Sequence, residues 1–236
     1  MEARCTAGPR RGTAGSRKSS ISVPTSTLWD LRPAWSASCI RRALAWCTTP
    51  GPPPRSGARA GCGGEWHDRT ALSAAARLAC RQALVLAPSY IDYARACALA
   101  GLEVGHLPLR PEEAFRVDLE RLEKHLHGGE LVFLGQPNNP TGQLCNRETL
   151  CRLAVARPDV AFVVDEAFAD FVEGYCSLAG EAPANLVALR SLTKIYAVPG
   201  LRLGYAVTGR ETASRLRALM PPWSVNVLAQ EVGRAL

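Results

Sequence analysis

One stretch of this 236-residue chain indicates its fold: residues 185–208, which read NLVALRSLTKIYAVPGLRLGYAVT. Apolar runs at 186–189 and 203–207 have the length and composition of buried strands. Between them lie the side chains that a phosphate-bearing aldehyde ligand would need: Ser191, Thr193, Lys194 and Arg202. A lysine amine can condense with an aldehyde, and hydroxyls with a guanidinium can hold a phosphate. The stretch therefore predicts two strands that frame a cofactor site.

From residue 77 onward, apolar runs alternate with stretches of helical spacing. Further strands are expected at 84–87, 103–107, 131–134 and 161–164, and helices at 89–100, 118–127, 147–156 and 211–220. Asp118 and Asn146 are expected as helix N-caps, and Gly101 as a C-terminal glycine. This alternation predicts an α/β fold with three α/β/α layers and a mostly parallel sheet. In such sheets, ligands bind beyond the carboxyl ends of the strands.

Three further motifs follow expected strands. Tyr90 comes after 84–87, Asn139 lies in an Asn-Asn-Pro-Thr-Gly run after 131–134, and Asp165-Glu166-Ala167-Phe168 comes after 161–164. A carboxylate at a strand end can pair with a protonated pyridine nitrogen. Simpler structural roles compete with these. The Asn-Pro-Gly run suits a plain turn, Tyr90 suits a core tyrosine, and Glu166 suits a helix cap or a solvated acid.

The run Ser-Leu-Thr-Lys-x-Tyr-Ala-x-Pro-Gly-Leu-Arg-Leu-Gly-Tyr, together with Asn139 and Asp165, resembles fold-type-I pyridoxal-phosphate enzymes. More narrowly it resembles the threonine-phosphate decarboxylases of cobalamin biosynthesis, relatives of histidinol-phosphate aminotransferases. The resemblance covers residues 77–236 and implies the large domain of such an enzyme, incomplete at both ends and without its small domain. It implies pyridoxal 5'-phosphate as the cofactor and Lys194 as the catalytic lysine. The implied cofactor-binding residues are Tyr90, Asn139, Asp165, Phe168, Ser191, Thr193, Lys194 and Arg202.

The implied reaction is decarboxylation of L-threonine O-3-phosphate to (R)-1-aminopropan-2-ol O-2-phosphate. Related aminotransferases have a tyrosine, which donates a hydrogen bond to the cofactor's phenolic oxygen, at the position of Phe168. Phenylalanine cannot donate, and this favours the decarboxylases, as does the run PWSVN at 222–226. The first alternative is a histidinol-phosphate-type aminotransferase that uses the same residues. The second is an inactive fragment, because the chain lacks a readable phosphate loop and the small domain.

The N-terminal part differs in composition from the rest. Residues 1–63 hold ten Lys or Arg against two acids, so they carry +8 while the remainder carries −1. A disordered basic tail, an organelle transit peptide and a shifted reading frame are the alternatives. Shifted decoding of 20–33 and of 64–77 yields runs that resemble the opening motif and the phosphate loop of the decarboxylase family. We therefore expect a frameshifted, largely unstructured segment at 1–76, followed by the partial pyridoxal-phosphate domain.

Composition argues against several other classes. The part after residue 63 is nearly neutral, which gives no reason to expect a nucleic-acid partner. The nine cysteines form no CxxC pair or zinc-like spacing, so we expect reduced, mostly buried thiols and no metal. No run reaches the roughly 18 apolar residues of a membrane span. We expect a cytoplasmic protein whose partner is a small phosphorylated amino acid, and the resemblance implies a homodimer.

Overall fold

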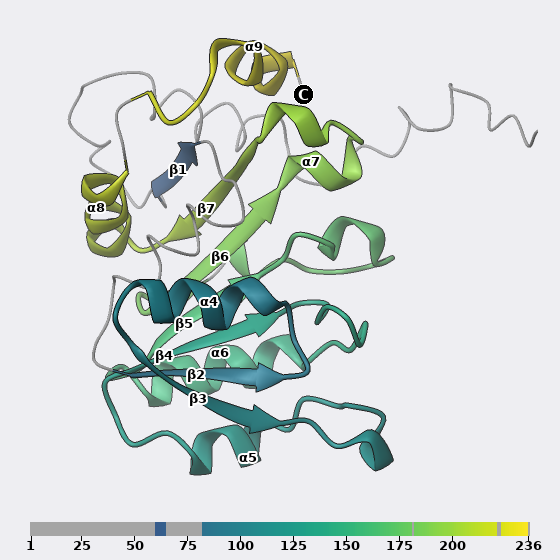
Figure 1. The fold of residues 1–236 in the computed structure, drawn as a ribbon, viewed down its shortest axis with the longest axis vertical. Coiled ribbons are helices and arrows are strands. Elements are labelled where there is room, and N and C mark those ends of the chain that lie inside the picture. Colours follow the sequence, from purple (N-terminus) through teal and green to yellow (C-terminus); the bar gives the residue numbers. More distant parts are fainter. Residues whose placement is uncertain (1–59, 65–81, 181, 221–222, 236) are drawn as a thin grey trace, which may run out of the picture. The chain divides into compact units, whose positions relative to one another are not determined.

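The structure is a computed structural model that describes residues 60–64, 82–180, 182–220 and 223–235. These residues form a seven-stranded sheet of order β1-β7-β6-β5-β4-β2-β3 (Figure 1). The strands are β1 (Ala60–Gly64), β2 (Gln82–Ala87), β3 (Glu103–Pro108), β4 (Glu130–Gly135), β5 (Ala161–Asp165), β6 (Leu186–Ser191) and β7 (Gly204–Thr208). Neighbouring strands are parallel throughout the part β6-β5-β4-β2-β3, whereas β7 runs antiparallel to both β6 and β1. The mostly parallel α/β sheet is confirmed.

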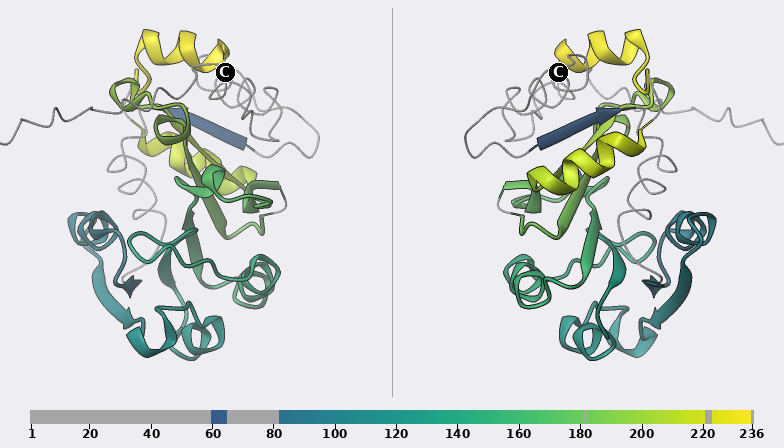
Figure 2. Two further views of the ribbon diagram at one scale, coloured as in Figure 1. Left: turned by 90° about the vertical axis from the view of Figure 1, so that its right-hand side faces the viewer. Right: turned by 90° about the vertical axis from the view of Figure 1, so that its left-hand side faces the viewer.

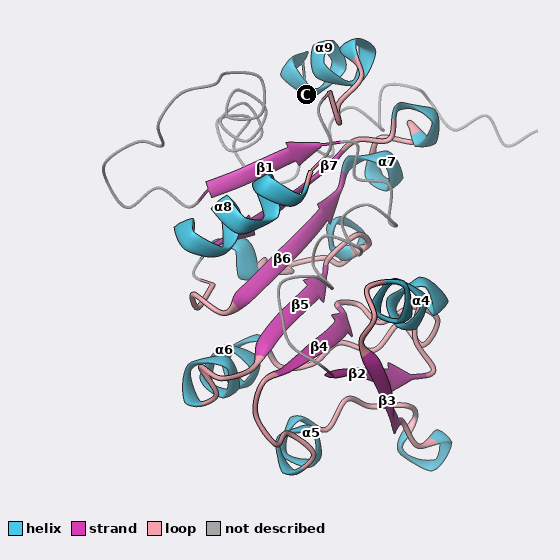
Figure 3. Ribbon diagram, turned by 60° about the vertical axis from the view of Figure 1, so that its left-hand side comes forward, coloured by secondary structure: helices cyan, strands magenta, loops and turns pink. Residues whose placement is uncertain are grey.

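Helices cover both faces of the sheet. On one face, α4 (Ile91–Leu99) and α8 (Arg210–Leu219) share a core with the inward side chains of the strands, among them Val85, Phe133 and Val163. On the other face lie α5 (Leu119–Lys124), α6 (Arg147–Ala156) and α9 (Val227–Ala235), whose core includes Val132, Phe162 and Leu186. Figure 2 shows α4 on one side of the strands and α5 and α6 on the other, and Figure 3 shows α8 beside β7. The three-layer arrangement is therefore confirmed.

Short helical turns fill several connections. They are the 3-10 turns η1 (Pro111–Glu113), η2 (Ala169–Phe171), η3 (Leu178–Gly180) and η4 (Pro199–Leu201), and the one-turn helix α7 (Leu192–Ile195). Of these, α7 and η4 form the connection between β6 and β7, so they lie where the sequence predicts the cofactor site.

The predicted helix boundaries have visible causes. The Asp118 carboxylate accepts hydrogen bonds from the backbone N–H groups of Glu120 and Arg121, both at 3.0 Å. The Asn146 side chain accepts from the Thr149 N–H at 2.8 Å. Caps of this kind each stabilise a helix by about 1 kcal/mol. Gly101 has a φ of +81° just after α4, a backbone region that glycine enters without strain. All three predictions are confirmed.

The central strands are buried along their whole length. Every residue of β4 and of β6 is buried, which explains why both read as apolar runs instead of alternating patterns. At the end of β4 the chain turns back sharply. A Cβ on Gly135 would lie 2.8 Å from the Cα of Asn138, so only glycine fits there without moving the backbone. This turn brings the Asn-Asn-Pro-Thr-Gly run to the edge of the sheet.

Two elements differ from the sequence-based expectation. β1 lies inside the stretch 1–76, for which no regular structure was expected, and pairs with β7 from Ala60↔Thr208 to Gly64↔Gly204. The rest of that stretch, including the motif at 20–33, lies outside the described residues. Helix α9 was not predicted, although Asn226 caps it by accepting from the Ala229 N–H at 2.9 Å. An Asn followed by Val, Leu and Ala could have indicated this start.

Five cysteines lie in the described part: Cys62 in β1, and four more after residue 82 that are free thiols. Cys97 and Cys145 are buried, and burial raises the pKa of each to about 12. Cys151 is half-buried and Cys176 is exposed. As for membranes, no helix in the described ranges has both the length and the apolar character that crossing a bilayer requires.

Candidate active site

The candidate residues gather at the carboxyl edge of the sheet. Asp165 is the last residue of β5, and its Cα pairs with those of Gly135 on β4 and Leu189 on β6. Ser191 ends β6 and pairs with Gly204 at the start of β7. Because β7 is antiparallel, its start lies at this same edge, and so does Arg202 just before it. The topology therefore brings the carboxyl ends of β1 to β6 and the start of β7 to one edge.

Lys194 lies between hydroxyls and an aromatic ring. Its Nζ donates to Thr193 Oγ1 at 3.3 Å, and Thr193 Oγ1 lies 2.8 Å from Ser191 Oγ. On its other side, Nζ is 5.9 Å from the centroid of the Phe168 ring, within the range of a cation–π contact. The structure thus brings together four of the predicted site residues: Phe168, Ser191, Thr193 and Lys194.

The Arg202 side chain has a donor that finds no partner among the described residues. The residue is left-handed, with φ 53° and ψ 54°, and one terminal nitrogen donates to the Pro199 carbonyl at 2.7 Å. Its Nε is buried and has no hydrogen-bond partner within the described residues. A buried guanidinium donor left unpaired is costly, and an anion such as a phosphate would satisfy it. The chemistry of this corner, two hydroxyls and a guanidinium, fits a phosphate group.

Asp165 is held by two donors. Its Oδ2 accepts from the Tyr93 hydroxyl at 2.8 Å, and its Oδ1 accepts from the Ala167 N–H at 3.0 Å. The Tyr93 ring is buried, stacks on Phe133 at 5.2 Å between centroids and meets Tyr90 edge-on at 5.5 Å. Donors to a carboxylate favour its ionised form, which is the form that pairs with a protonated pyridine. Tyr93 was missed in the sequence analysis, although it lies one helical turn after Tyr90.

Replacing Tyr93 with phenylalanine keeps the ring and removes the hydroxyl that donates to Asp165. We expect the free energy of unfolding to fall by about 1.5–3 kcal/mol, the range for a hydrogen bond to a charged group. Urea unfolding monitored by circular dichroism measures it. Tyr90→Phe loses a bond of the same kind, to Asp92 at 3.0 Å, and should lose free energy in the same range. A Tyr93→Phe loss below about 0.5 kcal/mol would contradict the prediction.

The loops after β2 and β4 are tied together by Asn138. Its Nδ2 donates to the Pro88 carbonyl at 3.0 Å and to Thr141 Oγ1 at 2.9 Å, while its Oδ1 is buried without a partner in the described part of the chain. Tyr90, the N-cap of α4, and Asn139 are both half-buried beside this contact. Asn138 therefore links the two loops that carry Tyr90 and Asn139.

A buried ion network lies behind the site and corrects one interpretation. Glu166 is fully buried, so it is not a solvated acid. Its carboxylate contacts the Tyr175 hydroxyl, Ser177, the Leu178 N–H and Arg190, which also pairs with Asp170. Burial, and after it the charge of Glu166, raises the pKa of Tyr175. The network fixes the loop that carries Phe168 to the strand that leads to Lys194.

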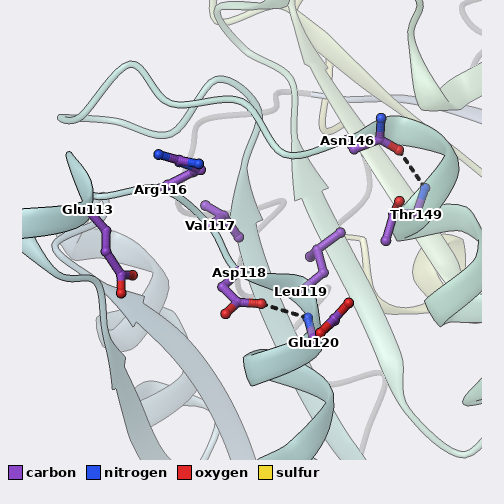
Figure 4. A pocket seen from close by; sticks show the side chains of 8 residues that line it. All are labelled: Glu113, Arg116, Val117, Asp118, Leu119, Glu120, Asn146 and Thr149. Carbon is purple, nitrogen blue, oxygen red and sulfur yellow. Dashed lines mark hydrogen bonds between the residues drawn. The ribbon is translucent and has the colours of Figure 1, made fainter.

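A hollow of about 520 Å³ lies away from these residues, between the 113–120 segment and the start of α6 (Figure 4). Its lining mixes Glu113, Asp118 and Glu120 with Arg116. Figure 4 shows Asp118 and Asn146 bonded to the backbone of their own helices, so these caps already use the helix starts. None of the eight candidate residues lines this hollow, and it does not define the site.

Comparison with known proteins identifies the family. The sequence profile of the family described as "Aminotransferase class I and II" matches residues 67–236, most of the chain. The chain belongs to this family. Membership in the aminotransferase class I and II family implies dependence on pyridoxal phosphate. The match begins before residue 77, where the resemblance in the sequence was expected to start.

Relatives within the aminotransferase class I and II family include both enzyme types that the sequence resembles. The chain is 36% identical over 176 residues to threonine-phosphate decarboxylase of Salmonella typhimurium, covering 72% of this chain and 48% of that protein. It is 35% identical over 146 residues to histidinol-phosphate aminotransferase of Thermococcus gammatolerans, covering 61% and 42%. The chain thus spans less than half the length of these curated relatives.

Solved structures of aminotransferases superpose on the fold. Histidinol-phosphate aminotransferase from Clostridium acetobutylicum gives a TM-score of 0.67 at 27% identity, covering 75% of this chain and 53% of that one. YbdL from Escherichia coli, described with a methionine aminotransferase function, gives 0.67 at 26% identity, covering 83% and 55%. These similarities support the large-domain fold, and they leave the choice between decarboxylase and aminotransferase open.

Proposed function

We propose that this protein is a pyridoxal-phosphate-dependent carboxy-lyase acting on L-threonine O-3-phosphate, with (R)-1-aminopropan-2-ol O-2-phosphate as the product used in cobalamin biosynthesis. The observation that carries the proposal is the pairing of Lys194 with Phe168, a ring that has no hydroxyl to donate. The identity to the Salmonella typhimurium decarboxylase supports it.

We assign the cofactor's parts to the residues at the carboxyl edge. Asp165, oriented by Tyr93, would face the ring nitrogen, and Tyr90 would stack on the ring. Ser191, Thr193 and Arg202 would hold the phosphate, which would satisfy the buried Nε of Arg202. Asn139 would donate to the phenolic oxygen. When bound, the cofactor supplies an aldehyde for the substrate amine and a ring that takes up the electron pair freed at the α-carbon.

Lys194 and Phe168 have the two remaining roles, proton transfer and positioning of the amine. In this proposal Lys194 Nζ holds the cofactor before substrate arrives, and delivers a proton to the α-carbon after CO2 has left. Phe168 positions that amine through its ring face, 5.9 Å away, without donating to the phenolic oxygen. The absence of this donor distinguishes the site from that of related aminotransferases.

A second candidate function is a histidinol-phosphate-type aminotransferase. The relative in Thermococcus gammatolerans and the superposed Clostridium acetobutylicum structure support it. In that case Lys194 would remove a proton from the amine-bearing carbon, and no carbon–carbon bond of the substrate would break. Every other assignment would be unchanged.

The two functions are separated by their products. The purified chain with pyridoxal phosphate is incubated with L-threonine O-3-phosphate, and in parallel with L-histidinol phosphate and an oxo-acid acceptor. Released CO2 is the result expected from the proposal. A keto product from histidinol phosphate, without release of CO2, would instead show that the chain is an aminotransferase. Cofactor binding without either product would support the inactive fragment.

We also propose the division into an anomalous segment, residues 1–76, and a partial large domain, residues 77–236. The basic composition of residues 1–63 supports it, whereas the family match already begins at residue 67. Sequencing the gene tests the frameshift: if the other frames do not encode the two expected motifs, the frameshift is rejected. The homodimer and the cytoplasmic location stay predictions.

A further inference from the structure

Asn226 connects the last helix to the turn that carries Arg202. It closes the PWSVN run, to which the proposed function gives no role. Its Oδ1 accepts from the Ala229 N–H at 2.9 Å and so caps α9. Its Nδ2 donates to the carbonyl of Leu201, the last residue of η4, at 3.1 Å. One side chain therefore joins two segments that are 25 residues apart.

The amide group is matched to both partners. An N–H needs an acceptor and a carbonyl needs a donor, and a carboxamide supplies one of each. These two contacts fix which way the amide is turned. A serine at this position would still accept from the Ala229 N–H, because serine is a good N-cap, but it is too short to bond the Leu201 carbonyl at the same time.

The turn held by Asn226 sets the backbone of Arg202. Arg202 follows Leu201 directly and is left-handed, with φ 53°. On the other side, the Val198 N–H donates to the Thr193 carbonyl at 3.1 Å and the Leu201 N–H donates to the Val198 carbonyl at 3.1 Å. The turn is thus tied to α7 at its start and to α9 at its end. The start of α9 is itself fixed in place, because Val225 and Ala229 are buried in the core.

We infer that Asn226 is a positioning residue for Arg202, and that through Arg202 it strengthens the binding of ligands that carry a phosphate monoester. The inference rests on the proposed assignment of Arg202 to the cofactor phosphate. Without the bond from Asn226, the Leu201 carbonyl is free to turn, and the left-handed backbone at Arg202 loses a support. The guanidinium then has to be ordered by the ligand itself, which weakens binding.

The test compares pyridoxal phosphate with pyridoxal, which lacks the phosphate, in the wild type, in Asn226→Ser and in Gln230→Ala. Dissociation constants come from fluorescence titration, and melting temperatures are measured without ligand. We expect Asn226→Ser to weaken the binding of pyridoxal phosphate about fivefold, the effect of one hydrogen bond, and to leave the binding of pyridoxal unchanged. The lost bond to Leu201 is exposed, so the melting temperature should fall only slightly. Gln230 bonds the Val225 carbonyl at 2.9 Å within the same helix start, so Gln230→Ala is expected to leave the ratio of the two constants unchanged.

The outcomes distinguish a failure of the positioning role of Asn226 from a failure of the proposed phosphate site. If Asn226→Ser keeps the wild-type preference for the phosphate, or weakens both ligands equally, the positioning role is overturned. If it lowers the melting temperature while the preference stays, Asn226 is merely structural. If the wild type itself shows no preference for pyridoxal phosphate over pyridoxal, the proposed phosphate site fails, whatever the variant does.

Discussion

Replacing Lys194 with alanine is expected to abolish covalent attachment of pyridoxal phosphate and to lower turnover by at least about 10²–10⁴-fold, the contribution of a positioned proton-transfer group. The amine of Lys194 lies at the end of β6 among the hydroxyls and the Phe168 ring, where the other candidate residues converge. Attachment is measured by incubating the chain with pyridoxal phosphate, reducing with borohydride and determining the intact mass. The alanine variant should show no added mass.

The matched control is Lys124→Ala, which removes an exposed lysine on α5 and should leave the adduct in place. Peptide mapping of the reduced wild type then gives the modified residue. An adduct on Lys18 or Lys124 instead of Lys194 would reject the assignment of the catalytic lysine. Turnover that survives in Lys194→Ala would reject it as well.

Arg190→Leu is expected to lower the free energy of unfolding by about 3–5 kcal/mol, because removing one partner leaves charges buried without compensation. The Arg190 side chain is 4% exposed, and the carboxylates of Glu166 and Asp170 that it faces are 0% and 8% exposed. Water cannot replace the lost cation at that depth. Urea unfolding followed by circular dichroism measures the change.

An exposed ion pair provides the comparison. Arg110 and Glu113 are 3.0 Å apart with side chains 50% and 42% exposed, and Arg110→Leu should cost about 0–1 kcal/mol. The double variant Arg190→Leu, Asp170→Asn should recover part of the loss, because one of the unpaired charges is then neutral. A loss for Arg190→Leu that matches the Arg110 control would mean that the buried network does not stabilise the fold.

Local signals in the sequence predicted most of the fold. The apolar runs at 131–134 and 186–189 lie within β4 and β6, since strands buried on both faces need no polar residue in their middle. Helix α6 has the predicted bounds, Arg147–Ala156, because Asn146 marks its start by a bond to a nearby N–H. Such signals act over a few residues and can therefore be read from the sequence alone.

The parts that were missed depend on distant contacts. Glu166 next to Asp165 looks like an ordinary acid until the fold brings it to Arg190, 24 residues later. The bond from Tyr93 to Asp165 joins residues 72 apart, and β1 acquires a partner only through β7. For the site, the family resemblance supplied the candidate residues, of which Phe168, Ser191, Thr193 and Lys194 lie together. The residues that support the candidates, Tyr93, Asn138 and Asn226, required the three-dimensional arrangement.

The place of β1 has a consequence for biosynthesis. Within the described sheet its neighbour is β7, so the first of these strands to leave the ribosome pairs with the one made last. Contacts between such distant segments close late, because the chain between them must be ordered first. The strands from β2 to β6 can assemble during translation, while β1 waits. The outer rim of the sheet is then completed only once β7 has emerged, and its amides should exchange with deuterium sooner than those of β4.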